Sequence, residues 1–490
     1  MNSSRNNHTT TDSSNTGAWS IARHAARRIM YFSLTTALVL AAPLVARATT
    51  PVITESDKFF PGDVTTSFGQ SVAVWGDTAV VGDPDNDLDG NNAGAAWVFV
   101  RSGSDWVEQT RLIPSGASAN DLFGTSVDIY DDYIVVGAPY DDGANDVGAG
   151  SAYVFRRDGA SWIEMTELVG AATVVGDPWD SPGWGDQFGH SVAINGDIPA
   201  DATNNEIWHN IFVGSPEDNH SQSLDAGSAY GFQLNAEGSA WVPMGKIYSN
   251  SPNSYAQFGI SVDLDGDHLI VGANKDGDDL LGGSGDPDPG VVYIWVRRGM
   301  DGNWNLETRL AADDPGFRDH FGASVAVYAL GGLATFVVGA PDNDDLGSGA
   351  GAAYIFRGSA MTFPQLLKLV ASDGSDYDGF GSSVAVNNDL MLIGAPFVGA
   401  QHDGAVYVIG RQGYSWAESQ RLNASDGGPL SEYFGTSVAL TGDLALVGAT
   451  EVDGSVSYGG AVYEFEDLIE DLFSDGFETG DTGAWSSTSP

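Results

Sequence analysis

The sequence predicts an all-β fold, a seven-bladed β-propeller built of four-stranded antiparallel blades. A Phe-Gly pair recurs seven times, at intervals of 54 to 70 residues. Each pair is followed by short β-branched and aromatic runs that Gly- and Asp-rich turns separate, which is typical of strands. No segment of comparable length in this region has a helical period. Seven units of four strands are the organisation of a β-propeller.

Residues 1–48 are expected to form a secretory signal peptide. Four arginines lie in a polar segment before an uncharged apolar stretch at 29–45, and Ala46-Arg47-Ala48 has the A-x-A pattern of a cleavage site. An uncleaved membrane anchor is the alternative, although the stretch is short for a bilayer span. We therefore expect a secreted protein, extracellular, periplasmic or associated with the cell surface, with no membrane span in the mature chain.

Residues 49–467 are predicted to form the propeller. In the second unit we expect strands at 126–130, 133–136, 151–156 and 162–169. A serine follows two residues after the glycine of every Phe-Gly pair, and an apolar-Gly pair ends every second strand. Because these residues recur at equivalent places, we interpret the serine as a structural hydroxyl and the glycine as a place where a Cβ does not fit. The serines are Ser71, Ser126, Ser191, Ser261, Ser324, Ser383 and Ser437.

The two ends of the chain complete the prediction. The last unit has no fourth strand after Tyr463, whereas Lys58-Phe59-Phe60-Pro61 resembles the fourth-strand ending Arg111-Leu112-Ile113-Pro114. We therefore expect the N-terminal segment to supply the outer strand of the last blade, which closes the ring and removes an exposed edge. Residues 468–490 leave the repeat and are interpreted as an acidic tail, with a sorting or processing signal as the alternative.

Composition excludes several functions. The chain has 20 Lys and Arg against 66 Asp and Glu, and it has no Cys. The absence of Cys excludes disulfides and thiolate chemistry. The acidic balance argues against binding of nucleic acid. The six histidines after residue 48 occupy unrelated repeat positions, and no catalytic constellation stands out. We therefore expect a monomeric protein that is not an enzyme.

The acidic residues gather on one face of the predicted ring. In an antiparallel blade, the loop between strands 2 and 3 and the connection to the next blade lie on the same side, and together they hold 34 of the 65 acids after residue 48. The loop at 85–90 begins like an EF-hand, but its twelfth position is Ala96 instead of the bidentate Glu. Weak Ca²⁺ binding is one interpretation, and a merely solvated acidic surface is the other. The candidate metal ligands are Asp85, Asp87, Asp89, Asp276, Asp278, Asp342 and Asp344.

The repeat resembles a known family. A Phe-Gly pair followed by Gly-Ala-Pro, as at 137–139, 339–341 and 394–396, is similar to the FG-GAP repeat. The best-known members of this family are the head propellers of integrin α subunits. The resemblance implies an extracellular binding or adhesion protein with a cell-surface, matrix or glycan partner. Integrin-type repeats carry a D-x-D-x-D-G-x-x-D calcium loop that is usually a tight turn here, with a remnant at 263–267, so the calcium ligands of the family do not carry over.

Two other functions remain open. A secreted polysaccharide lyase or glycoside hydrolase would have its site at the propeller axis, where two acids in a deep pocket would favour it. A structural protein of the cell envelope would use the acidic surface mainly for solubility. The fold cannot decide between them.

Overall fold

The computed structural model divides into two units, Met1–Ala48 and Thr49–Pro490. Every residue described below belongs to the second unit. The described residues are 53–63, 67–142, 148–170, 185–197, 208–219, 223–250, 253–277, 280, 288–298, 303–359, 362–413, 415–426, 432–452 and 459–468.

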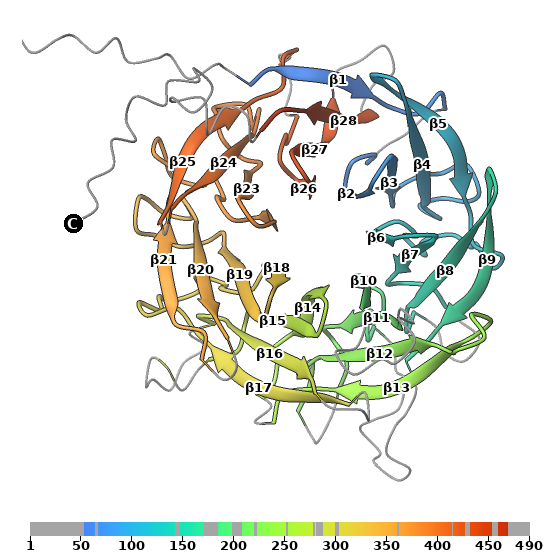
Figure 1. The fold of residues 1–490 in the computed structure, drawn as a ribbon, viewed down its shortest axis with the longest axis horizontal. Coiled ribbons are helices and arrows are strands. Elements are labelled where there is room, and N and C mark those ends of the chain that lie inside the picture. Colours follow the sequence, from blue (N-terminus) through green and yellow to red (C-terminus); the bar gives the residue numbers. More distant parts are fainter. Residues whose placement is uncertain are drawn as a thin grey trace, which may run out of the picture. The chain divides into compact units, whose positions relative to one another are not determined.

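The described residues form 28 strands in seven four-stranded antiparallel sheets, which are the blades of one ring (Figure 1). The all-β, seven-bladed prediction is confirmed. Blades 1 to 3 contain β2 (Ser71–Trp75), β3 (Thr78–Asp83), β4 (Ala95–Ser102), β5 (Asp105–Leu112); β6 (Ser126–Tyr130), β7 (Tyr133–Ala138), β8 (Ser151–Asp158), β9 (Ser161–Leu168); and β10 (Ser191–Asp197), β11 (Trp208–Ser215), β12 (Ser228–Leu234), β13 (Trp241–Ile247). Blades 4 and 5 contain β14 (Phe258–Asp265), β15 (His268–Ala273), β16 (Val291–Arg297), β17 (Trp304–Leu310); and β18 (Ser324–Leu330), β19 (Leu333–Ala340), β20 (Ala352–Gly358), β21 (Gln365–Leu369). Blades 6 and 7 contain β22 (Ser383–Val386), β23 (Leu390–Ala395), β24 (Ala405–Gln412), β25 (Ser415–Leu422); and β26 (Ser437–Thr441), β27 (Leu444–Val452), β28 (Gly459–Phe465), with β1 (Glu55–Phe59).

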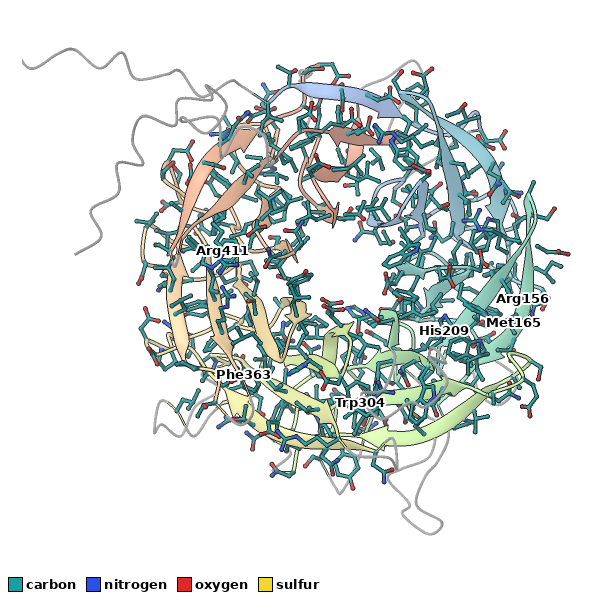
Figure 2. All side chains as sticks on the ribbon, viewed as in Figure 1. Arg156, Met165, His209, Trp304, Phe363 and Arg411 are labelled. Atoms are coloured by element: carbon teal, nitrogen blue, oxygen red, sulfur yellow. The ribbon has the colours of Figure 1, made fainter. Side chains whose placement is uncertain are left out.

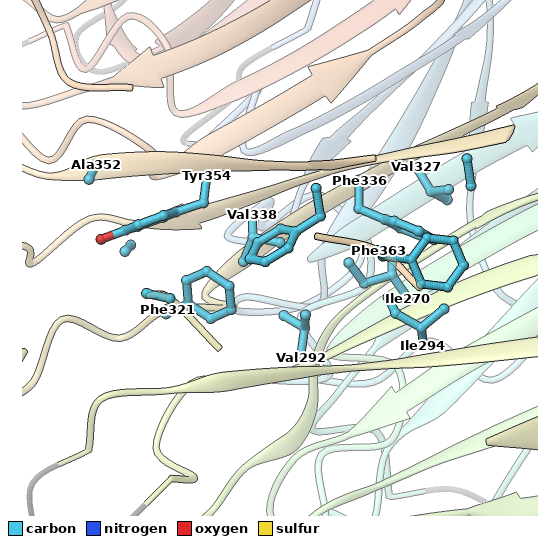
Figure 3. Packing of buried hydrophobic residues seen from close by; sticks show 14 of the residues in the cluster. Ile270, Val292, Ile294, Phe321, Val327, Phe336, Val338, Ala352, Tyr354 and Phe363 are labelled. Carbon is cyan, nitrogen blue, oxygen red and sulfur yellow. The ribbon is translucent and has the colours of Figure 1, made fainter. Parts of the chain in front are cut away.

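The hydrophobic core lies between neighbouring blades. Figure 3 shows the contact between blades 4 and 5, where Ile270 and Val292 of blade 4 pack against Phe336 and Tyr354 of blade 5. All four side chains are fully buried. A blade presents both faces of its sheet to neighbours, so its second strand is apolar on both sides, and β7, β15 and β23 are buried along their whole length.

The two ends of the described chain meet in blade 7. Strand β1 pairs antiparallel with β28, with Lys58 opposite Tyr463 and Phe59 opposite Val462. The predicted closure by the N-terminal strand is therefore confirmed. Leu468 is fully buried in the core next to blade 7, so the ring packing extends one residue beyond the predicted limit of 467.

The repeated serines join each blade to the next. Every serine Oγ donates a hydrogen bond of 2.7–2.9 Å to the glycine carbonyl of the following Phe-Gly pair, and the last of them, Ser437, reaches back to Gly69. The seven bonds form a closed circle around the ring. The serine is therefore structural, as predicted.

The glycine of each second strand makes this approach possible. A Cβ added at any of these seven glycines would lie 1.9–2.2 Å from the same glycine carbonyl oxygen of the next blade. The next chain segment occupies the space where a side chain would stand. The repeated glycine thus allows two backbones to touch, as its position in the sequence predicts.

Replacing Ser324 by Ala is expected to lower the free energy of unfolding by about 1 kcal/mol, because the 2.8 Å bond to the Gly381 carbonyl is lost. Urea denaturation measures the effect. The control is Ser102→Ala, since Ser102 is exposed at the end of β4. Equal stability of the two variants would show that the circle of serine bonds contributes nothing.

Candidate functional site

The two sets of acid-bearing segments meet at one side of the ring. Gly94, at the end of the loop between β3 and β4, forms a bridge with Phe123 at the start of blade 2. The same bridge joins Gly227 to Phe258, and it recurs twice more in later blades. We call this side, made of the loops between strands 2 and 3 and the connections between blades, the acidic face.

The first predicted metal loop connects β3 to β4. Asp87 accepts a hydrogen bond of 2.7 Å from the Asn92 amide, and Asp89 forms a 3.2 Å ion pair with Arg111 of β5. Asp85 lies exposed in the same loop. Asp87 and Asp89 are thus already engaged within the protein, Asp89 by a cation.

The other predicted ligands lie in different environments. Asp276 is 1% exposed, and its carboxylate accepts bonds from the Asn253 side chain, the Gly277 amide and the Tyr293 hydroxyl at 2.6–2.8 Å. This makes Asp276 part of the core beneath the face. Asp342 lies 2.6 Å from the His320 ring, and Asp344 accepts a 2.9 Å bond from the Gly349 amide. Asp278 lies outside the described residues.

These carboxylates do not assemble into one centre in the part of the chain that the structure describes. No three Asp, Glu or His side chains come together there in a group that could hold a metal ion. Calcium binding stays a prediction for the acidic face.

A recurring contact explains why so many acids lie close to the core. The aromatic residue of each third strand stands opposite a residue of the fourth strand that is basic in six blades. In blade 3, Lys246 lies 2.9 Å from Asp218, and the Tyr230 hydroxyl donates a 2.6 Å bond to the same carboxylate. In blade 7, Lys58 lies 2.5 Å from Asp426, to which Tyr463 also donates. Such ion pairs neutralise part of the acidic face.

Blade 2 departs from this pattern. Glu167 stands where the other blades have Lys or Arg, opposite Tyr153. The Tyr153 hydroxyl donates to Asp141, and Asp121 lies in the same region with hydrogen bonds from Ser118. Burial, with smaller contributions from Asp141 and its neighbour, raises the pKa of Asp121. Blade 2 is therefore the place where the acidic face is least compensated by its own fourth strand.

The opposite face carries arginines at or just after the ends of the third strands, and several of them are paired with acids. Arg101 lies 3.1 Å from Glu464, Arg157 3.2 Å from Asp132, and Arg298 2.8 Å from Glu307. Positive charge on this face is thus compensated locally.

The first strands of all seven blades enclose a cavity of about 470 Å³ on the axis of the ring. Valine, alanine and other apolar side chains form much of its wall, and Trp75, Tyr130 and Tyr328 also line it. Asp128, Asp263 and Asp265 are its acidic residues, and its described lining contains no Lys, Arg or His.

Asp128 and Asp263 occupy equivalent places in blades 2 and 4. Asp128 accepts a 2.7 Å bond from the Ile194 amide of blade 3, and Asp263 accepts one of the same length from the Val327 amide of blade 5. A second bond of 2.8 Å comes to each from the next residue of its own strand. Burial raises the pKa of both carboxyls to about 7, and the charge of Asp263 adds to the effect on Asp128.

Neither Asp128 nor Asp263 is among the predicted site residues, and Asp263 enters the sequence argument only as part of the calcium-loop remnant at 263–267, although a further signal is present. The position two residues after the repeated serine is alanine in five blades and aspartate in blades 2 and 4. At a first strand, which faces the axis, an aspartate in place of the repeated alanine indicates a function that is specific to that blade. Asp128 and Asp263 each connect their own blade to the next by accepting a backbone hydrogen bond from it.

Within the described residues, no helix has the length and apolar character needed to cross a bilayer.

Comparison with known families agrees with the repeat. The FG-GAP repeat family matches six times, over residues 54–99, 106–155, 241–295, 304–356, 363–409 and 416–465. Each match runs from the outer strand of one sheet to the third strand of the next blade. The interval between the second and third matches contains most of blade 3, which nevertheless has the same serine bond from Ser191 to Gly259.

No individual curated protein matches the chain. The six repeat matches together cover more than half of the 490 residues, and the ring has the blade structure that the repeat predicts. The chain therefore belongs to the FG-GAP repeat family.

Proposed function

We propose that this protein is a secreted, non-enzymatic binding or adhesion protein, which recognises a cell-surface or matrix partner, protein or glycan, through its acidic face. The observation that supports this most directly is the meeting of acid-bearing loops from successive blades on one side of the ring. A continuous field of one sign favours a partner with a basic patch and accelerates encounter.

The environment of Asp128 and Asp263 in the axial cavity supports a structural role for them instead of a catalytic one. Asp128 and Asp263 each accept two backbone hydrogen bonds, so their oxygens are engaged in holding the blades. A general acid or nucleophile must reach its substrate within hydrogen-bond distance. We also propose that Ca²⁺ binding to the acidic face strengthens binding of the partner. The Kd for Ca²⁺ is expected to be about 10⁻⁴ to 10⁻³ M, as in extracellular calcium modules, because the loop at 85–90 lacks the bidentate Glu.

Immobilised mature protein, presented with culture supernatant and outer-membrane extract, is expected to retain a partner in ~0.15 M salt and to release it in ~1 M salt, where charges are screened beyond about 3 Å. Parallel columns with EDTA and with millimolar Ca²⁺ at matched ionic strength test the calcium role. A variant whose acids at 85, 87 and 89 are changed to Asn tests the contribution of this loop and is expected to retain less of the partner. Retention that neither salt nor these substitutions weaken would contradict binding through the acidic face.

The axial cavity is the specific observation that favours an enzyme as second candidate, because it contains two carboxyls whose pKa is raised to about 7. Raised carboxyl pKa values are a feature of glycoside hydrolases. Turnover of a polysaccharide that is lost in Asp128→Ala or Asp263→Ala would support this candidate over a binding protein.

A further inference from the structure

A second cavity, of about 560 Å³, lies between blades 3 and 4. It is lined by residues of β11, β12 and β13 on one side and of β16 and β17 on the other. Among the lining residues, Met244, Ile247, Trp295, Trp304 and Leu306 also pack against the hydrophobic core between these two blades. The cavity therefore borders that core.

The cavity lies where one pair of side chains is missing. Gly231 of β12 stands opposite Gly245 of β13, and both line the cavity. The equivalent cross-strand pairs in blades 1, 2, 4, 5 and 6 are Val98–Thr110, Val154–Thr166, Ile294–Thr308, Ile355–Leu367 and Val408–Gln420. A Cβ added at Gly245 would meet nothing within 4 Å, whereas one added at Gly231 would lie 3.0–3.2 Å from the side chains of Phe212 and Met244, which occupy that space. Blade 3 thus lacks two adjacent side chains that these five blades possess.

Two tryptophans of blade 4 line the opposite side. Trp304, labelled in Figure 2, belongs to the outer strand of blade 4. It packs against Phe212 of blade 3, with ring centroids 5.1 Å apart and planes nearly perpendicular. Trp295 occupies the third-strand position where blades 1, 2, 3, 5 and 7 have Phe. Both tryptophans are only partly buried, as is Trp162 of blade 2, whereas Trp106 and Trp416, equivalent to Trp304, are 6% and 4% exposed. Both indoles contribute to the wall of the cavity.

The remaining lining is neutral and polar. Gln233, Asn250 and Asn303 contribute amides. The one cation among the described lining residues, Lys246, forms a 2.9 Å ion pair with Asp218, and both side chains are almost completely buried. No formal charge is therefore available to attract an ion, and the cavity is suited to an uncharged ligand with both apolar and hydrogen-bonding surfaces.

We propose that the cavity between blades 3 and 4 binds a neutral pyranose unit of a glycan. A sugar ring presents C–H groups on its faces, which pack on aromatic rings, and hydroxyls at its edge, which pair with amides. The volume lies within the range of ordinary small-ligand sites. The proposal rests on the proposed binding function, to which it adds a ligand class and a second place on the ring, between two blades.

The test combines Trp295→Phe with Trp304→Phe. Phe99 and Phe363 hold the equivalent positions in blades 1 and 5, so the ring accepts phenylalanine at both places. Binding is measured by saturation-transfer NMR and tryptophan fluorescence, with methyl glycosides of glucose, galactose, mannose, fucose and N-acetylglucosamine and with their oligosaccharides as probes. Trp416→Phe is the matched control, since it makes the same change in blade 6.

At least one neutral sugar is expected to bind the parent and Trp416→Phe, and to lose about tenfold or more in affinity in the double variant. Binding of no neutral sugar, or equal binding by both variants, would overturn the proposal. Binding of indole or p-cresol without any sugar would also overturn it and would indicate a site for an aromatic peptide side chain. Salt-sensitive retention of a partner on the acidic face is measured separately, so the sugar site can fail while that function stands.

Discussion

Phe59→Ala is expected to lower the free energy of unfolding by about 3–5 kcal/mol, the usual range for truncation of a buried phenylalanine. Phe59 is 5% exposed at the end of β1, and its ring lies 4.8 Å from Phe99 and 5.5 Å from Trp106 of blade 1. It therefore packs on the neighbouring blade while its own strand completes blade 7. Urea denaturation followed by circular dichroism and tryptophan fluorescence gives the loss.

The neighbouring residue supplies the control. Phe60 is 61% exposed, so Phe60→Ala removes the same atoms at the next position and is expected to change stability by less than about 0.5 kcal/mol. Deleting residues 49–62 should have a larger effect than Phe59→Ala, since it also removes the Lys58–Asp426 ion pair and leaves β28 as an exposed edge. Equal stability of the Phe59 and Phe60 variants would contradict the closure.

The second large effect concerns the two carboxyls of the axial cavity and the pH dependence of stability. Replacing both Asp128 and Asp263 by Ala is expected to flatten the dependence of stability on pH. Burial raises the folded-state pKa of each carboxyl from 3.8 to about 7, so between these values the folded protein binds more protons than the unfolded chain. Stability therefore falls as pH rises through this window. In the double variant this fall should be smaller.

Thermal and urea unfolding at pH 5 and pH 8 measure the difference. The free energy of unfolding of the parent should fall by about a few kcal/mol more than that of the variant over this interval, since one pKa unit corresponds to about 1.36 kcal/mol. At pH 8 the loss of two disfavoured charges offsets the loss of the bonds to Ile194 and Val327. Asp158→Ala, at the exposed end of β8, is the control. Parallel pH profiles of parent and double variant would contradict the prediction.

Much of the ring can be predicted from the sequence because its signals are local and repeated. Seven serines at one position, seven glycines at another and a missing last strand define the blades, their number and the closure. The serine interpretation holds because one bond, from Ser71 to the Gly124 carbonyl, recurs in every blade. Repetition turns a weak local pattern into a specific architecture, since all units must bury the same face against the same neighbour.

The candidate sites are less well predicted, for a physical reason. A count of acids treats Asp89, Asp276 and Asp342 alike, yet Arg111, Tyr293 and His320 give them different environments. These partners lie up to 22 residues away, on other strands and loops. Whether such carboxylates bind calcium stays a prediction.

The sequence by itself determined the all-β class, the seven blades, the closing strand and the structural serines, because each depends on spacing that repeats along the chain. Only the tertiary structure decided that Asp128 and Asp263 join blades beside the axis, and that Gly231 and Gly245 face each other beneath Trp304. These features depend on cross-strand register and on contacts between blades, where departures from the repeat meet in space. The open space beside Gly245 and the tryptophans of blade 4 come from different blades, and the sequence of neither blade shows by itself that they line one cavity.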